Sequence, residues 1–282
     1  MIFIIISVFV IYFRAAAQTW DGSESTNWNT PGNWSTNAIP LSTGAVTIPN
    51  TANKPVLPAN TTLASLNMSA GSALNFNGYS LTITANVNIS GAIINNSNGG
   101  TDVLFTITSG GGAGSNYIGG STFNDHVIFN INGTGTTYEG YQLSNIFNGN
   151  ALFNLNGTGL FYSSYNQKST FNGNFSLFIT VAGITDLFNS GYDNIAGDFN
   201  YINNAGGDNY INSGSVLSGS IGGTINITTS GTGNPIFMLR RIKNLTAGGT
   251  ISVINPGRVL IDNDTLTIAS LSVTGISGSS GD

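Results

Sequence analysis

The sequence has no cysteine and few charged side chains. Of its 282 residues only 7% are charged, with 7 Lys and Arg against 12 Asp and Glu. The absence of cysteine excludes a disulfide framework and thiol chemistry. The scarcity of Lys and Arg leaves no basic patch, so nucleic acid is not an expected partner. Since 40% of the residues are apolar and the charge is low, the composition also argues against intrinsic disorder.

What the sequence has in abundance is repetition, with a period of 24 residues between about Leu81 and Gly231. Two apolar columns at this period lie two residues apart: Leu81, Phe105, Phe129, Phe153, Leu177, Tyr201, Ile225, and Ile83, Ile107, Ile131, Leu155, Ile179, Asn203, Ile227. Further columns hold aromatic residues or glycine: Phe123, Phe147, Phe171, Ile195; Tyr117, Tyr141, Tyr165; and Gly111, Gly135, Gly159, Gly183, Gly207, Gly231. A fixed period of this length indicates a solenoid.

The spacing within each unit predicts strands. Apolar residues two apart put their side chains on one face of a strand, and a unit of 24 residues cannot bury that face without stacking on its neighbours. The glycine column marks corners that need a positive φ or a close backbone approach. No window keeps a helical period. We therefore predict an all-β fold, a right-handed parallel β-helix with coils of about 24 residues, with a two-residue insertion in a turn after Ile195.

Three segments are expected along the chain. Residues 1–18 predict a secretory signal peptide, because the apolar run Ile2–Phe13 is too short to span a bilayer and ends in Ala15-Ala16-Ala17. Residues 19–60 hold all three Trp and several Pro, which predicts an N-terminal cap over the open end of the solenoid. The alternative for these Trp is a sugar-stacking platform. Residues 61–282 are the predicted β-helix, so no membrane span is expected in the mature chain.

The N-terminal part resembles the start of large secreted surface proteins of Bacteroidetes. The resemblance is carried by Trp20, Gly22, Trp28 and Trp34, then by Val46-Thr47-Ile48-Pro49 and Gly78-Tyr79-Ser80-Leu81-Thr82. In that group, and in autotransporter-like adhesins, such openings lead into parallel β-helices. The resemblance implies an extracellular or cell-surface location and often adhesion, and it implies no catalytic residue.

Reactive side chains are sparse. Stacking at the repeat period places Asp102 one coil from His126, in a column that continues as Asn150, Asn174 and Asp198. Acid–base catalysis needs two suitable groups on one surface, and Asn fills the next two places of this column, which favours a polar ladder at a turn. The single Gly206-Gly207-Asp208 does not repeat as calcium-binding solenoids do. We therefore expect no catalytic residue, no metal site and no cofactor.

The most distinctive predicted surface is an outward-facing ladder of Thr and Asn. Its residues are Thr82, Thr84, Thr106, Thr108, Asn130, Asn132, Asn154 and Asn156. Such ladders stabilise stacked strands by themselves, and they can also present a binding surface.

The sequence predicts a secreted or cell-surface structural or adhesive protein without enzymatic activity, acting as a rigid stalk or display surface. The partners we expect are a glycan or cell-surface ligand, or another copy of the chain joined end to end. Two alternatives stay open: a carbohydrate-active β-helix enzyme of the polysaccharide lyase or glycoside hydrolase type, and a self-associating extracellular filament subunit.

Overall fold

The computed structural model describes most of the chain after the predicted leader. The described residues are 17–109, 115–181, 185–188, 193–205, 209–211, 219–229, 236–242, 245–247, 249–254, 258–263, 266–267 and 270–274. The predicted signal peptide therefore lies outside them except for Ala17 and Gln18, and Gly206-Gly207-Asp208 lies outside them entirely.

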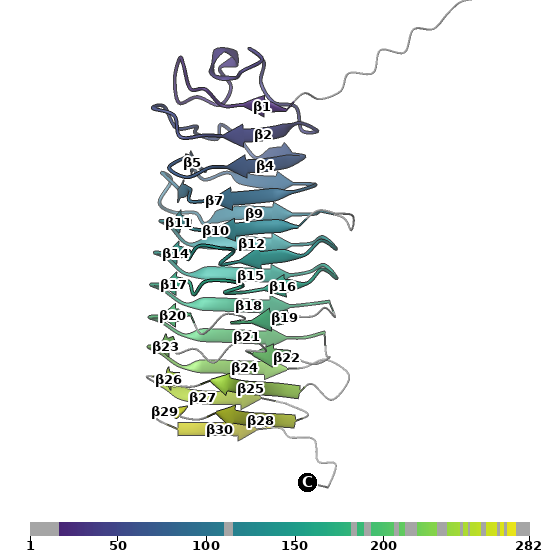
Figure 1. Ribbon diagram of the computed structural model, residues 1–282, viewed down its shortest axis with the longest axis vertical. Coiled ribbons are helices and arrows are strands. Elements are labelled where there is room, and N and C mark those ends of the chain that lie inside the picture. The colour runs from purple at the N-terminus through teal and green to yellow at the C-terminus, as the bar shows by residue number, and fades with distance from the viewer. Residues whose placement is uncertain are drawn as a thin grey trace, which may run out of the picture.

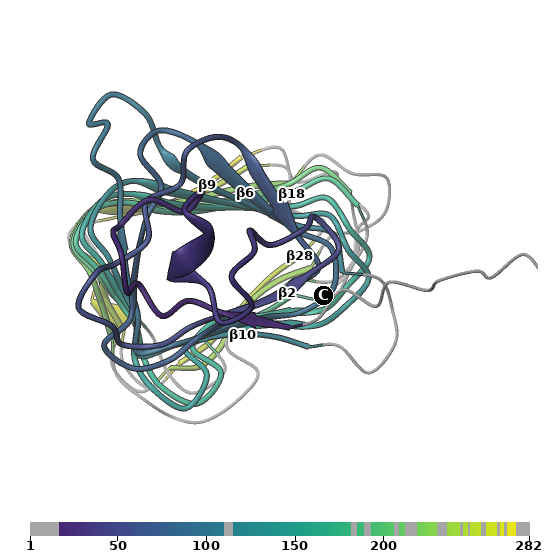
Figure 2. The same cartoon turned by 90° about the horizontal axis from the view of Figure 1, so that it is seen from above.

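The described strands stack into a solenoid of three parallel sheets that run the length of the molecule (Figure 1). Seen along the axis, the 11-stranded and 10-stranded sheets form opposite sides, and the 9-stranded sheet closes one edge between them (Figure 2). The one helix among the described residues is the short 3-10 helix η1, Pro31–Asn33. The prediction of an all-β parallel solenoid is confirmed.

The bounds of the strands follow the repeat. The 11-stranded sheet contains β1 (Gln18–Thr19), β2 (Ala45–Ile48), β4 (Ser65–Met68), β7 (Val87–Ser90), β10 (Asn116–Gly119), β13 (Thr137–Glu139), β16 (Phe161–Tyr162), β19 (Thr185–Leu187), β22 (Asn209–Ile211), β25 (Ile236–Ile242) and β28 (Arg258–Asn263). The 9-stranded sheet contains β5 (Ala73–Asn75), β8 (Ile93–Asn95), β11 (Thr122–Phe123), β14 (Ile146–Phe147), β17 (Thr170–Phe171), β20 (Asn194–Ile195), β23 (Gly219–Ile221), β26 (Leu245–Ala247) and β29 (Leu266–Thr267). The 10-stranded sheet contains β3 (Thr61–Leu63), β6 (Ser80–Ile83), β9 (Val103–Ile107), β12 (Val127–Ile131), β15 (Ala151–Leu155), β18 (Phe175–Ile179), β21 (Phe199–Asn203), β24 (Ile225–Thr229), β27 (Thr250–Ile254) and β30 (Ser270–Thr274).

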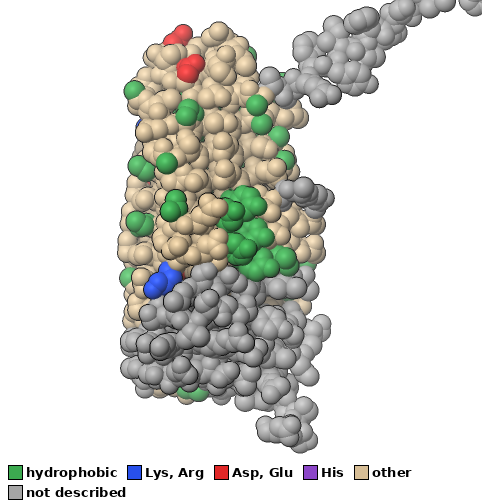
Figure 3. Space-filling view, viewed as in Figure 1, with side chains coloured by type: hydrophobic (Ala, Val, Ile, Leu, Met, Phe, Trp, Pro, Cys, Tyr) green, Lys and Arg blue, Asp and Glu red, His purple; other side chains and the backbone are tan. Residues whose placement is uncertain are grey.

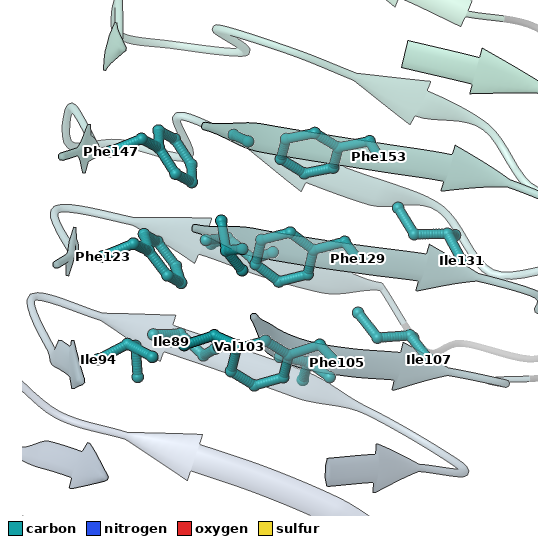
Figure 4. Packing of buried hydrophobic residues seen from close by; sticks show 14 of the residues in the cluster. Ile89, Ile94, Val103, Phe105, Ile107, Phe123, Phe129, Ile131, Phe147 and Phe153 are labelled. Atoms are coloured by element: carbon teal, nitrogen blue, oxygen red, sulfur yellow. The ribbon is translucent and has the colours of Figure 1, made fainter. Parts of the chain in front are cut away.

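The core consists of like side chains stacked coil upon coil. Phe129 pairs in register with Phe105 and Phe153, and its ring lies parallel to theirs with centroids 5.0 and 4.9 Å apart. Phe123 and Phe147, from the 9-stranded sheet, stack at 4.7 Å and point at these rings from the side (Figure 4). All five side chains are fully buried. The predicted inward columns are therefore confirmed in this part of the chain.

The predicted glycine corners rest on close backbone approach. A Cβ atom at Gly159 would collide with the carbonyl oxygen of Gly135 in the neighbouring coil, and Gly157 meets Gly133 in the same way. Neither Gly135 nor Gly159 has a positive φ. The other four members of the predicted column lie outside the described residues.

Past Ile195 the predicted columns need a correction of two residues. Ile195 pairs with Ile221, which confirms the insertion. Consequently Tyr201 pairs with Ile227, whereas the uninterrupted period placed it with Ile225. The insertion is absorbed before β23, and the parallel pairing continues beyond it, as expected when extra residues enter a turn.

The three Trp pack together at the N-terminal end. Trp28 lies 4.7 Å from Trp34 and Trp20 lies 5.0 Å from it, both edge to face, and all three are almost completely buried. The indole nitrogen of Trp34 donates to the carbonyl of Trp28. Their burial does not leave ring faces for stacking on a sugar. Within residues 19–60, β2 is already a member of the 11-stranded sheet.

Replacing a stacked core ring tests this architecture. Phe129→Ala removes a buried ring and its stacking contacts with the two neighbouring rings. We expect it to lower the free energy of unfolding by about 3–5 kcal/mol. Phe178→Ala, on the half-buried outer face of β18, should cost clearly less. Urea denaturation followed by circular dichroism gives both values. Equal costs would contradict a core built on the Phe105–Phe129–Phe153 stack.

Candidate functional site

The predicted Thr and Asn ladder lies on the outer face and edge of the 10-stranded sheet. Thr82, Thr106, Asn130 and Asn154 stack in register on β6, β9, β12 and β15. Asn154 donates to the side chain of Asn130 at 2.8 Å, and the exposed Asn156 donates to that of Asn132 at 3.1 Å. Thr84 and Thr108 follow β6 and β9, and the backbone N–H of each bonds to the preceding coil. The structure thus brings the predicted residues together, but many of their polar groups already bond to one another.

Asp102 and His126 occupy adjacent coils, as predicted from the repeat. Each immediately precedes a strand of the 10-stranded sheet, and Val103 pairs with Val127. The column continues as a hydrogen-bonded ladder, in which Asn150 accepts from the backbone of Asn174 at 2.9 Å. No hydrogen bond or ion pair joins the side chains of Asp102 and His126 within the described residues. The predicted polar ladder at the turn is confirmed from Asn150 onward.

The surface that the sequence interpretation only partly found is a cluster of tyrosines on the 11-stranded sheet. Tyr117, Tyr138 and Tyr162 stack in register from β10, β13 and β16, with centroid distances of 5.4 and 5.2 Å. Tyr141 and Tyr165 form a second column, 6.0 Å apart. The predicted single column of Tyr117, Tyr141 and Tyr165 is therefore wrong in its register, because Tyr117 pairs with Tyr138.

These five residues, which we call the tyrosine platform, form one continuous aromatic surface. The two columns touch, since Tyr117 lies 4.2 Å from Tyr141 and Tyr138 lies 4.4 Å from Tyr165. All five rings are half-buried. The face carrying the 11-stranded sheet shows one large patch of hydrophobic side chains at mid-height, amid a mostly polar surface (Figure 3).

A polar depression adjoins the tyrosine platform. It has a volume of about 310 Å³ and is lined by Asn88, Ile89, Ser90, Tyr117, Gly119, Tyr141 and Gln142. Burial raises the pKa of Tyr138, and the neighbouring Tyr165, Tyr162 and Tyr117 raise it further. This phenol is therefore neutral at physiological pH, so Tyr138 offers a ring face and an uncharged hydroxyl group.

Two carboxylates lie inside the solenoid beneath the platform. Glu139 and Asp193 are both fully buried. Glu139 accepts hydrogen bonds from the side chains of Asn145 and Ser169 and, at 2.9 Å, from the backbone N–H of Ser164. Asp193 accepts from the hydroxyl of Ser164 and, at 2.6 Å, from the backbone N–H of Ser169. The two serines thus bridge the two acids.

The pKa values of both buried acids are raised, which favours their protonated forms. Burial raises the pKa of Glu139, against the opposing effect of the bonds from Asn145, Ser164 and Ser169. Burial raises the pKa of Asp193 well above its usual range, and the charge of Glu139 adds to the increase. The hydrogen bonds from Ser164 and Ser169 and the charge of Lys168 oppose it. The Oδ2 atom of Asp193 has no hydrogen-bond partner among the described residues.

The repeat contained a signal for this cluster. Ser121, Asn145, Ser169 and Asp193 form a column at the repeat period, two residues before the inward-facing Phe123, Phe147, Phe171 and Ile195. Residues two apart on a strand face the same side, so their burial follows from the pattern. At this corner, side chains take the place of backbone carbonyls as hydrogen-bond acceptors between coils. The backbone N–H of Ser121 donates to the side chain of Asn145, and the backbone N–H of Asn145 donates to the side chain of Ser169.

The described residues contain no group of three or more His, Cys, Asp or Glu side chains placed to hold a metal ion. None of their helices has the length and apolar character needed to cross a membrane.

Comparison with known proteins gives one match. A family described as a domain of unknown function (DUF8693) matches residues 19–103. The match covers the three Trp and the first coils, and it stops before the tyrosine platform and the buried acids. No curated protein and no solved structure matches the chain.

The buried acids predict a stability that falls as pH rises. Because the pKa values of both acids are raised in the folded state, the protein takes up protons on folding at pH values above the usual carboxyl range. Each proton taken up lowers the free energy of unfolding by up to about 1.4 kcal/mol for every unit that the pH rises. Asp193→Asn keeps the shape but cannot titrate, so we expect it to flatten the decline in unfolding free energy between about pH 5 and about pH 8. Urea titrations of the wild type and of Asp193→Asn across this range measure the two slopes, and an unchanged slope in Asp193→Asn would refute the prediction.

Proposed function

We propose that this protein is a non-enzymatic, secreted or cell-surface β-solenoid that binds glycans through the tyrosine platform. The observation that carries the proposal is the continuous surface of five half-buried tyrosine rings beside a polar depression. The rest of the solenoid acts as a rigid rod that displays this surface. The apolar leader and the resemblance of residues 19–95 to secreted surface proteins support the location.

Tyrosine combines the two properties that a sugar-binding surface needs. Its ring face packs against the apolar C–H face of a pyranose, and its hydroxyl exchanges hydrogen bonds with sugar hydroxyls. The rings of the platform already contact one another, so little side-chain entropy is lost when a ligand settles on them. Asn88, Ser90 and Gln142 add polar groups at the edge of the platform.

The charge of the protein favours neutral glycans. The formal net charge is -5, and no Lys or Arg lines the depression beside the platform. The net negative charge disfavours the approach of a polyanionic chain. The preferred ligand is therefore a polymer of neutral hexoses or pentoses.

The placement of the acids favours binding over hydrolysis. Glycoside hydrolysis in most families requires two carboxyl groups that flank the sugar bond. Among the described residues, the fold brings Glu139 and Asp193 together as a pair of acids, and both are fully buried. Asp102 is exposed, but its neighbour in the next coil is His126 rather than a second acid.

A binding assay with ring-deleting variants tests the proposal. The probes are hydroxyethyl cellulose, laminarin, xylan and mannan, with polygalacturonate as the anionic counterpart. We expect at least one neutral polymer to bind and polygalacturonate to bind more weakly. Tyr138→Ala removes the central ring and should weaken binding at the platform about tenfold or more, equivalent to about 1.4 kcal/mol, whereas Tyr138→Phe keeps the ring and should retain most of the platform's affinity.

Phe178→Ala is the matched control, because it removes an outward-facing aromatic ring from the opposite sheet. Its affinity should equal that of the wild type. The proposal is wrong if none of the neutral polymers binds, or if Tyr138→Ala and Phe178→Ala reduce binding equally.

A further inference from the structure

A second surface with the chemistry of a saccharide site lies at the corner where the 9-stranded sheet leads into the 10-stranded sheet. Two adjoining depressions, of about 260 and 320 Å³, share Asp102 and Ile128 in their walls. Together they form one groove along the long axis of the solenoid, which we call the corner groove.

The floor of the corner groove is aliphatic. Leu104, Ile128 and Leu152 stack in register on β9, β12 and β15, facing outward between the buried columns. All three are half-buried. At one end, the groove reaches Tyr79, whose side chain is 37% exposed. This floor can receive the C–H faces of several consecutive sugar rings.

The rim of the corner groove is polar and unsatisfied. It consists of the column Asp102, His126, Asn150 and Asn174. The amide oxygens of Asn150 and Asn174 accept backbone hydrogen bonds from the next coil, which orients both amides and leaves their NH₂ groups as donors. Within the described residues, these NH₂ groups and the side chains of Asp102 and His126 have no protein partner. A column that offers a carboxylate as an acceptor for hydroxyl groups and amide NH₂ groups as donors to them suits a carbohydrate.

The spacing and the chemistry exclude other ligands. Rim groups recur once per coil, at about 4.8 Å, which is comparable with the length of one pyranose ring. Asp102 supplies a negative charge, and no Lys or Arg lines either depression, so a phosphate or uronate chain is disfavoured. An extended peptide in the groove would lie on the face of a sheet. It could not add a strand, because that requires the free backbone groups of a sheet edge.

We infer that the corner groove is a second binding site for a neutral saccharide chain, and that it makes the protein bivalent. The platform lies on the 11-stranded sheet, and the groove lies at the edge of the 10-stranded sheet. These two sheets form opposite sides of the solenoid (Figure 2). One glycan chain lying along the rod reaches one site only, so a protein occupied at both sites links two chains. The bivalence rests on the proposed function of the platform, whereas the groove stands on its own residues.

The experiment counts the sites and tests for cross-linking. Isothermal titration with oligosaccharides cut from the neutral polymer that binds best should give two equivalents for the wild type. The groove variant Asp102→Ala/Ile128→Thr and the platform variant Tyr138→Ala should each give one tight equivalent. A protein that carries both the groove and the platform substitutions should bind the oligosaccharide at least tenfold more weakly than either variant. The full-length polymer should become turbid with the wild type and stay clear with either variant.

Phe178→Ala is the matched control, since it alters an outward-facing residue of β18 outside the groove. It should keep two equivalents and the turbidity, and circular dichroism should show that every variant is folded. The inference is overturned if the wild type binds one equivalent and Asp102→Ala/Ile128→Thr leaves binding unchanged. Loss of binding in the groove variant together with wild-type binding by Tyr138→Ala would instead retain the groove and refute the platform. Absence of binding to any neutral polymer would refute both.

Discussion

In-register stacking of identical positions in successive parallel coils is the constraint on which the whole structure depends. A single coil has too few residues to enclose a core, so each coil is stable only when the next one covers it. The parallel pairing of Phe105, Phe129 and Phe153 shows what this requires, because each ring lies flat on the next. A shift of one residue would turn such rings toward solvent. The apolar pattern therefore fixes the register, and the register then places every other side chain.

The outer surface follows from the same constraint. When like residues lie one above another, a motif that recurs along the sequence becomes a row along the rod. Asn rows bond to themselves and mainly stabilise the stack, as between Asn130 and Asn154. Rows of Tyr and of aliphatic residues instead leave surface that no neighbouring coil can cover. The tyrosine platform and the corner groove are both such surfaces, and the proposed binding of extended glycans rests on them.

The sequence predicted the fold and most of the inward columns, because a strict period carries that information directly. It failed where the period changes. Tyr138 was missed because the step from Tyr117 is 21 residues rather than 24, so counting by the longer step found only Tyr141. The burial of Asp193 was readable from its place two residues before Ile195. Its bridging to Glu139 was not, because Glu139 belongs to a different column of the repeat, and only the turn geometry at Ser164 and Ser169 brings the acids together.

The register itself can be measured directly, because the chain contains no cysteine that would interfere. Asn148 and Asn172 are neighbours in adjacent coils, joined by a side-chain hydrogen bond of 2.9 Å. Adjacent strands lie about 4.8 Å apart, which suits a disulfide, whereas positions two coils apart are too distant. The account predicts that Asn148→Cys/Asn172→Cys forms an intramolecular disulfide on mild oxidation and that Asn124→Cys/Asn172→Cys does not. Free thiols in the first protein, or cross-linking in the second, would contradict the stacking of coils.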